Sequence, residues 1–138
     1  MGKLLALDYG KKRIGVAQTD DLKIIASPLI TVSEKDIIKF LSNYLQKENV
    51  ESIIIGDPKT LNNKPAEVSK NIKILSQKIH KIFKIPIILI DERFTSKIAL
   101  KTMVMMNSSK KKRRNKSDID KISAALILQT YLDRKIEI

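Results

Sequence analysis

The sequence predicts an α/β fold in which a mixed five-stranded sheet, three antiparallel strands followed by two parallel strands, is flanked by helices. Three extended segments joined by short turns occupy the first 32 residues. Two wholly apolar runs then follow segments with helical periodicity, which is typical of strands buried between helices. The length of 138 residues and the hydrophobic fraction of 43% suit one domain with its own core, so we expect residues 1–138 to form a single unit.

The amino-terminal part of the chain predicts a three-stranded antiparallel meander. The first strand, Lys3–Tyr9, is rich in Leu and is closed by Gly10. A Gly-Lys-Lys-Arg turn leads to the second strand at residues 14–19, and residues 24–32 form a third extended segment that is interrupted by Pro28. Turns this short favour antiparallel pairing of the strands that they join.

A helix and a buried strand are predicted next. Ser33 can cap the helix, with Asp36 three residues later as a weak capping-box partner. The apolar side chains on one face of this helix are those of Ile37, Ile38, Leu41, Tyr44 and Leu45. Residues 52–55 then form a short, wholly apolar strand that ends in Gly56.

The rest of the chain predicts three helices and one more strand. One helix begins near Pro65, a residue favoured in the first helical position, and residues 86–90 form the fifth strand. Residues 95–106 and 118–132 predict the last two helices. The fourth and fifth strands are reached through helical crossovers, so we expect them to run parallel to the first strand in the middle of the sheet.

The net charge is the most informative bulk property. Lysine and arginine number 27 and aspartate and glutamate 15, which gives +12. This excess favours a polyanionic partner, although a well-solvated lysine-rich surface would give the same value. The absence of cysteine excludes disulfides and thiolate metal sites. No apolar run approaches the roughly 18 residues of a membrane span, and the apolar stretch before Asp8 is too short for a signal peptide, so we expect a cytoplasmic protein with no membrane partner.

Three acidic residues are candidates for a functional site. Asp8 lies at the end of the first strand, where an acid is costly to bury without a partner or a metal, although turn amides could also satisfy it. Glu92 follows the fifth strand and could instead form a salt bridge with Arg93 or be solvated. Asp120 lies in the first turn of the last helix, where Ser117 and Asp120 also match a capping box.

Strand geometry connects these acids. The carboxyl ends of parallel strands open on the same side of a sheet, which is where open α/β sheets place their sites. Asp8 and Glu92 lie at such ends, and Asp120 from a helix start could complete the cluster. Clustered carboxylates favour a hard cation, so we predict that all three bind Mg²⁺ or Mn²⁺ and act in catalysis. Two such ions about 4 Å apart can activate a water and stabilise the leaving oxygen in phosphodiester cleavage.

Several segments also carry a resemblance to a known family. They are Leu-Asp-Tyr-Gly at residues 7–10, Gly-Asp-Pro at 56–58, Asp-Glu-Arg-Phe-Thr-Ser at 91–96, and Asp-Lys-Ile-Ser-Ala-Ala at 120–125 followed by Gln129. In this order, over nearly the whole chain, they resemble the bacterial YqgF family, described as pre-16S rRNA nucleases or Holliday junction resolvases. The resemblance implies a ribonuclease H-like fold and puts the family's three acids at Asp8, Glu92 and Asp120. Asp120 is preferred over Asp118 because it keeps the family's spacing to the Ala-Ala pair and to Gln129.

Two positions depart from the pattern of the YqgF family. Many relatives carry an Asn-x-Asp-Gly-like loop after the Gly-x-Pro turn, whereas residues 61–64 here are Leu-Asn-Asn-Lys and lack the loop acid. Whether this altered loop affects activity is open. Asp57 stands where an apolar residue is common, and we interpret it as a turn residue.

Basic residues near the predicted site are candidates for binding nucleic acid. Residues 110–116 contain six basic residues in seven and precede the helix that carries Asp120. Such a run is usually a solvated loop, but beside a metal site it can grip phosphates. The candidates are Lys11, Lys12, Arg13, Arg93, Lys110, Lys111, Lys112, Arg113, Arg114 and Lys116. With three Phe, three Tyr and no Trp, stacking surfaces are scarce, which favours recognition of backbone and shape.

The expected activity is divalent-metal-dependent hydrolysis of phosphodiester bonds in structured nucleic acid. The resemblance implies processing of the 5′ end of pre-16S rRNA; cleavage of four-way DNA junctions and a non-catalytic, RNA-binding role in ribosome assembly are the alternatives. The partner is therefore structured RNA, such as a ribosomal precursor, or branched DNA. An ATPase of the actin or sugar-kinase kind also uses an Asp-x-Gly turn, but 138 residues cannot supply its second domain. Because two symmetric junction cuts require a dimer, both a monomer and a homodimer are open.

Overall fold

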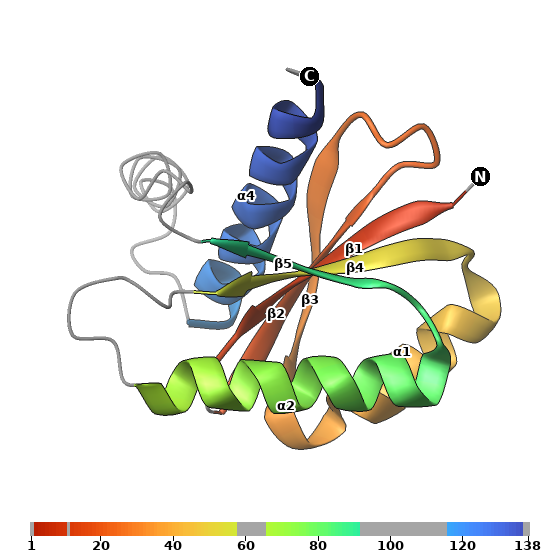
Figure 1. The fold of residues 1–138 in the computed structure, drawn as a ribbon. Helices are drawn as coiled ribbons and strands as arrows, with labels where there is room; N and C mark the ends of the chain where they lie inside the picture. Colours follow the sequence, from red (N-terminus) through yellow and green to blue (C-terminus); the bar gives the residue numbers. More distant parts are fainter. Residues whose placement is uncertain (1, 11, 58–65, 92–115, 137–138) are drawn as a thin grey trace.

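The computed structural model describes residues 2–10, 12–57, 66–91 and 116–136 (Figure 1). Its elements are, in chain order, β1 (Lys3–Tyr9), β2 (Arg13–Thr19), β3 (Ala26–Ser33), η1 (Glu34–Asp36), α1 (Ile37–Lys47), β4 (Val50–Asp57), α2 (Ala66–Phe83), β5 (Ile87–Asp91) and α4 (Lys116–Ile136). The strands form one sheet in the order β3-β2-β1-β4-β5. β1 pairs antiparallel with β2, and β2 with β3, whereas β4 pairs parallel with β1 and with β5. The predicted mixed sheet is therefore confirmed.

β4 and α4 extend furthest beyond their predicted limits. β4 covers Val50–Asp57 rather than residues 52–55, because it pairs with β1 on one side and with β5 on the other. α4 begins at Lys116 and ends at Ile136, two residues before and four residues after the predicted limits. The helix predicted at residues 95–106 lies outside the described residues.

The start of α1 differs from the predicted capping box. The 3₁₀ turn η1 separates Ser33 from α1, so Asp36, and not Ser33, is the residue before the helix. The Ser33 hydroxyl donates to the Asp36 carboxylate at 2.9 Å, and neither side chain makes a capping bond to the backbone. The two polar side chains therefore satisfy each other instead of the first backbone amides of the helix.

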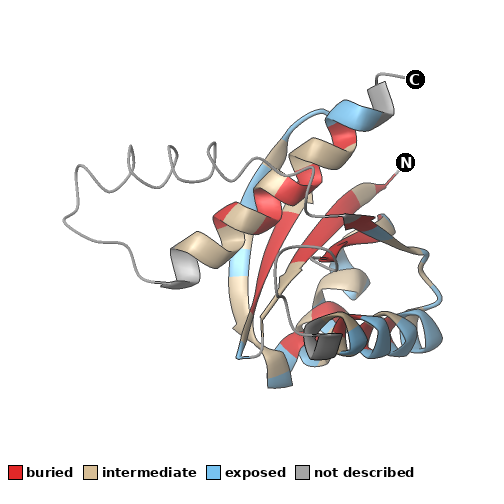
Figure 2. Cartoon of the chain, turned by 60° about the vertical axis from the view of Figure 1, so that its left-hand side comes forward, coloured by how far each residue is buried: buried red, intermediate tan, exposed pale blue. Residues whose placement is uncertain are grey.

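Helices cover the two faces of the sheet (Figures 1 and 2). α1 and α2 pack on one face and α4 on the other, each over its own cluster of buried side chains. Side chains of β1 alternate between these clusters: Leu5 and Leu7 belong to the first, and Leu4 and Ala6 to the second. Within the described segments, no helix has both the length and the apolar character needed to cross a membrane. Because side chains of a strand point alternately to its two faces, this pattern also determines the face on which each residue at the end of β1 lies.

The strand β3 is an edge of the described sheet and is irregular. Its pairing with β2 shifts register between Val16 and Ala17, where Pro28 is the partner of Ala17. Proline has no amide hydrogen and is tolerated in a sheet at edges and bulges. The break predicted at Pro28 is therefore a local irregularity within a continuous strand.

Side chains fix the other end of the β2–β3 hairpin. The hydroxyl of Thr19, which is 2% exposed, accepts a hydrogen bond from the Leu4 amide at 2.9 Å. The Asp20 carboxylate accepts bonds from the amides of Leu22, Ile24 and Ile25. The amide bonds from Ile25 and Ile24 lower the pKa of Asp20. The Asp20 carboxylate thus organises the turn, whereas the Thr19 hydroxyl joins the end of β2 to β1.

Replacing Thr19 with Val should destabilise the protein by about 1–3 kcal/mol, because the buried Leu4 amide would lose its acceptor while the side-chain shape is kept. Chemical denaturation followed by circular dichroism measures this difference. Thr19→Ser keeps the hydroxyl and is the control, expected to lose less than Thr19→Val. Equal stability of the Val variant and the wild type would contradict the assigned role of this hydrogen bond.

Candidate functional site

Asp8 lies near the carboxyl end of β1, on the face of the sheet that α4 covers. It follows Leu4 and Ala6 in the strand alternation and is partly buried. Its partner in the β1–β2 ladder is Gly15. Ala17, two residues further along β2 on the same face, belongs to the cluster under α4. Asp8 is therefore next to the one glycine of β2.

At Gly15, the backbone of α4 lies directly against the sheet. A Cβ atom built on Gly15 would lie 2.0 Å from the carbonyl oxygen of Asp120 and 2.3 Å from its carbonyl carbon. Backbone therefore lies against backbone, an approach that any side chain would block. Asp8 is the ladder partner of Gly15, so Asp8 and Asp120, 112 residues apart in sequence, flank the same small area of the sheet.

The Asp120 carboxylate forms an ion pair with Arg13. Nε of Arg13 donates to Oδ2 of Asp120 at 2.8 Å, with the two side chains 38% and 24% exposed. Arg13 lies on the α4 face, because it alternates with Ile14 and shares its side with Gly15. The carboxylate of Asp120 therefore has a side-chain partner on β2, and a helix-capping role is not required to explain an acid at this position. Arg13, which the sequence suggested for binding nucleic acid, is placed against the acid cluster itself.

Several predicted residues fall outside the described part of the chain. Glu92 directly follows Asp91, the last residue of β5, and is among them. The others are Lys11, Arg93, Lys110, Lys111, Lys112, Arg113 and Arg114, together with the loop at 61–64. Lys12 is described and exposed, and its carbonyl accepts a bond from the Glu34 amide at 3.0 Å. Lys116 is the first residue of α4.

The donor atoms at this site suit a hard cation. Asp8 and Asp120 offer only carboxylate oxygens, the ligands that Mg²⁺ and Mn²⁺ prefer. Across the described ranges, no group of three His, Cys, Asp or Glu residues is close enough to hold a metal. Two acids are thus brought together, and a third would have to come from elsewhere in the chain. Arg13 offsets the charge of one of them.

The structure corrects the interpretation of Asp57 as a turn residue. Asp57 is the last residue of β4, pairs with Asp91 of β5 and is 7% exposed. The hydroxyl of Ser69, a residue of α2, donates a hydrogen bond of 3.1 Å to Oδ1 of Asp57. Because α2 covers the opposite face from α4, Asp57 is separate from the Asp8–Asp120 pair. The bond from Ser69 makes burial of this acid tolerable.

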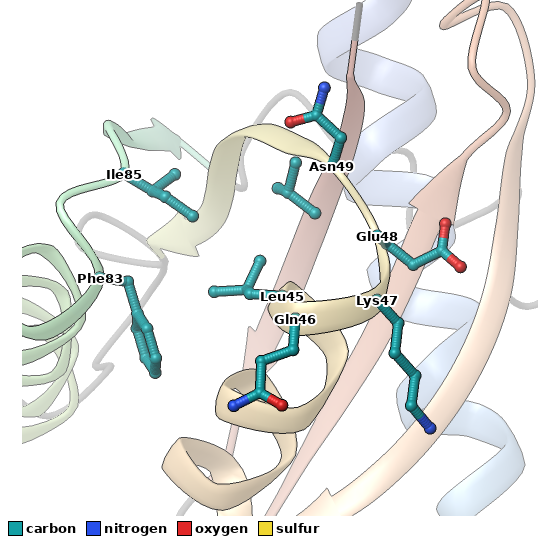
Figure 3. A pocket seen from close by; sticks show the side chains of 8 residues that line it. Leu45, Gln46, Lys47, Glu48, Asn49, Phe83 and Ile85 are labelled. Atoms are coloured by element: carbon teal, nitrogen blue, oxygen red, sulfur yellow. The ribbon is translucent and has the colours of Figure 1, made fainter.

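A hollow of about 530 Å³ lies at the other end of the parallel strands (Figure 3). It is bordered by the end of α1, the start of β4 and the segment between α2 and β5, with Leu45, Val50, Phe83 and Ile85 as its apolar wall. Asp8 is at the carboxyl end of β1, which runs parallel to β4. The hollow is therefore not part of the carboxylate site.

Comparison with known protein families shows to which family this chain belongs. Residues 2–134 match the RuvX family, described as Holliday junction resolvase. The chain belongs to this family. A protein of Christiangramia forsetii named "Putative pre-16S rRNA nuclease" is 47% identical over 133 residues, covering 96% of this chain and 98% of that protein. A protein of the same name from Phocaeicola vulgatus is 48% identical over 136 residues, covering 98% of each chain.

Solved structures with low sequence identity share the fold of this RuvX family member. Thermus thermophilus RuvC in complex with a Holliday junction substrate gives a TM-score of 0.59 at 12% identity, covering 97% of this chain and 96% of that one. The fowlpox virus Holliday junction resolvase gives 0.55 at 14% identity, covering 97% and 99%. The fold is ribonuclease H-like, as the sequence resemblance implied.

Replacing Gly15 with Ala should destabilise the protein by about 3 kcal/mol, because the added methyl group would meet the α4 backbone, which cannot rotate away as a side chain can. Thermal unfolding measures the loss. Gly2→Ala is the control, since a Cβ there lies 3.0 Å from Cγ of Glu51 and 3.1 Å from backbone atoms. A Gly15→Ala protein as stable as the control would mean that α4 does not pack against β2 in this way.

Proposed function

We propose that this RuvX family member is a divalent-metal-dependent nuclease that cleaves phosphodiester bonds in structured nucleic acid. The observation that carries the proposal is the placement of Asp8 and Asp120 around Gly15 at the carboxyl end of the central strand. Carboxylate oxygens presented together from β1 and α4 are the ligands that Mg²⁺ and Mn²⁺ prefer. The names of the relatives refer to a nuclease and the description of the family to a resolvase, and both support the same chemistry.

Glu92 is proposed as the third carboxylate. The basis is its position in sequence, directly after β5, together with the alternation in which Ile88 and Ile90 contact the cluster under α4. β5 is parallel to β4, and β4 to β1, so the carboxyl end of β5 is on the same side of the sheet as Asp8. Asp8, Glu92 and Asp120 would then hold the ions jointly.

Each residue of the proposed site has a distinct task. Asp8 and Asp120 present oxygen ligands from β1 and α4, two elements fixed against each other through Gly15. Bound Mg²⁺ or Mn²⁺ would supply an activated water and stabilise charge on the leaving oxygen. Arg13 holds Asp120 in place and keeps positive charge at the position where a phosphate would enter. Rigid positioning of this kind is a major contribution to phosphoryl-transfer catalysis.

Binding of the substrate is assigned to basic residues around the proposed site. Lys12 is exposed in the turn before β2, and residues 110–116 immediately precede the turn of α4 that carries Asp120. Lys11 and Arg93 adjoin Asp8 and Glu92 in sequence. The net charge of +12 supports contacts with the phosphate backbone rather than with base edges.

The proposed substrate is pre-16S rRNA, the RNA that the names of the relatives mention. We propose that cleavage is at its 5′ end and takes place in the cytoplasm. A second candidate is a four-way DNA junction, favoured by the description of the family and by the fold shared with RuvC. A dimer that makes two symmetric cuts would support the second candidate, and a monomer the first. Parallel assays on a precursor rRNA and on a synthetic junction distinguish them.

Asp8→Asn, Glu92→Gln and Asp120→Asn should each reduce cleavage by at least about 100-fold, because each removes a charged metal ligand. The measurement is single-turnover cleavage of both substrates, with thermal unfolding to confirm the fold. Asp57→Asn is the matched control: this acid also ends a central strand but contacts Ser69 on the other face, so its variant should keep cleavage. Full activity of Asp8→Asn or Asp120→Asn would exclude the proposed site.

Removal of divalent cations should abolish cleavage. Mg²⁺ or Mn²⁺ should restore it, and Ca²⁺ should restore it poorly because its larger radius and looser coordination hold the reacting oxygens less well. Dialysis against EDTA followed by titration of each cation measures this. Cleavage that is undiminished in excess EDTA would refute the metal-dependent mechanism, whatever the outcome of the carboxylate variants.

A further inference from the structure

The outward side of α2 carries a stripe of positive charge. Residues 70, 73, 77 and 81 recur at intervals of three and four, so they share one side of a helix with 3.6 residues per turn. They are Lys70, Lys73, Gln77 and Lys81, and all four are exposed. The opposite side of the helix is buried against the sheet. We call Lys70, Lys73 and Lys81 the α2 stripe.

Lysine outnumbers acidic residues along α2, whose one acid, Glu67, lies in the first turn of the helix. From Ser69 to the end of α2 at Phe83 the sequence contains four lysines and no aspartate or glutamate. None of the three ion pairs found among the described residues involves a lysine of α2. The segment 34–48, which contains α1 on the same face of the sheet, has three acids and three lysines. The imbalance is therefore a property of α2 and not of this face in general.

Helix stability alone does not account for this pattern. Lys70 and Lys73 are three residues apart, as are Lys78 and Lys81, and like charges at this spacing repel. Lys81 is in the last turn, where a cation is favoured by the helix dipole. Lys70 and Lys73 are outside that turn, so the dipole does not favour them in this way. A series of like charges along one side of a helix points to a function.

The α2 stripe begins beside the carboxylate edge of the sheet. Lys70 and Lys73 border a hollow of about 340 Å³, together with Asp57, Ser69 and Leu89. Asp57 ends β4, and the β1–β4 register pairs Leu7 with Ile55, so Asp8 is level with the residue before Asp57. From Lys70 the α2 stripe runs along the helix to Lys81, a distance of eleven residues or about 16 Å. Along the axis of a nucleic-acid duplex, that length spans about five base pairs, at one phosphate of each strand per 3.4 Å of axis.

We propose that the α2 stripe binds the phosphate backbone of a duplex arm of the nucleic acid whose cleavage is proposed at Asp8 and Asp120. The inference rests on the proposed function for the identity of the substrate. The stripe lies outside the carboxylate site, on the other face of the sheet. It therefore holds a part of the substrate that extends past the sheet edge, which suits a branched or folded molecule better than an isolated short duplex.

The test compares two triple variants that remove the same charge. Lys70→Gln, Lys73→Gln and Lys81→Gln together remove the stripe; Lys35→Gln, Lys39→Gln and Lys47→Gln remove three exposed lysines from η1 and α1. Affinity for a four-way DNA junction and for a folded precursor rRNA is measured against salt in EDTA, where the proposed cleavage cannot occur. The stripe variant should flatten the slope of log affinity against log salt by about two to three units and weaken binding at least about tenfold at physiological salt. The control variant should keep the wild-type slope.

Other outcomes separate this proposal from the nuclease proposal. Cleavage by the stripe variant at saturating substrate should keep the wild-type rate, and its melting temperature should not fall. A stripe variant with the wild-type slope and affinity for both probes would overturn the inference, and the stripe would then face some other anionic partner. Altered binding by the stripe variant combined with no cleavage by the wild type would retain the stripe as a nucleic-acid surface and reject the nuclease.

Discussion

The close contact between α4 and β2 is the constraint on which the rest of the site depends. At Gly15 the helix backbone rests directly on the strand backbone, which fixes the height of α4 above the sheet and the position of Asp120. Small side chains continue this contact, since Ala6, Ala17 and Ala124 are fully buried between the helix and the sheet. A larger residue at any of these positions would lift the helix and move Asp120 away from Asp8. The packing of α4 on the sheet therefore determines the position of Asp120 relative to Asp8.

The sequence predicted the sheet well because strand signals in this chain are local. Alternating or wholly apolar runs separated by short turns are sufficient to recognise β1 to β5, and helical crossovers are sufficient to make the last two parallel. The same reasoning placed Asp8 at a strand end. What joins Asp8 to Asp120, however, is a contact between a strand glycine and a helix far along the chain. Glycine within a strand can indicate a close backbone approach, but it does not reveal which element approaches.

Two side chains show why the remaining features could not be predicted. The sequence suggested Asp57 as a turn residue, because it stands where an apolar residue is common in the family, yet it is buried at the end of a strand. Its burial depends on the Ser69 hydroxyl from the following helix, a partner that no spacing rule identifies. Arg13 was grouped with the turn lysines because of its charge, but it alternates onto the face that holds Asp120. In both cases the chemistry of the residue was evident and its partner was set by tertiary structure.

The irregular outer strand has a consequence for behaviour at high concentration. An exposed sheet edge with a full row of unpaired amides and carbonyls is a template for intermolecular β-pairing and aggregation. Pro28 has no amide hydrogen to offer to a further strand, and the register shift opposite it interrupts the regular ladder. A neighbouring molecule would therefore meet an irregular strand along β3. This device limits self-association through that edge without using charge, which leaves the positive surface of the protein available for its ligand.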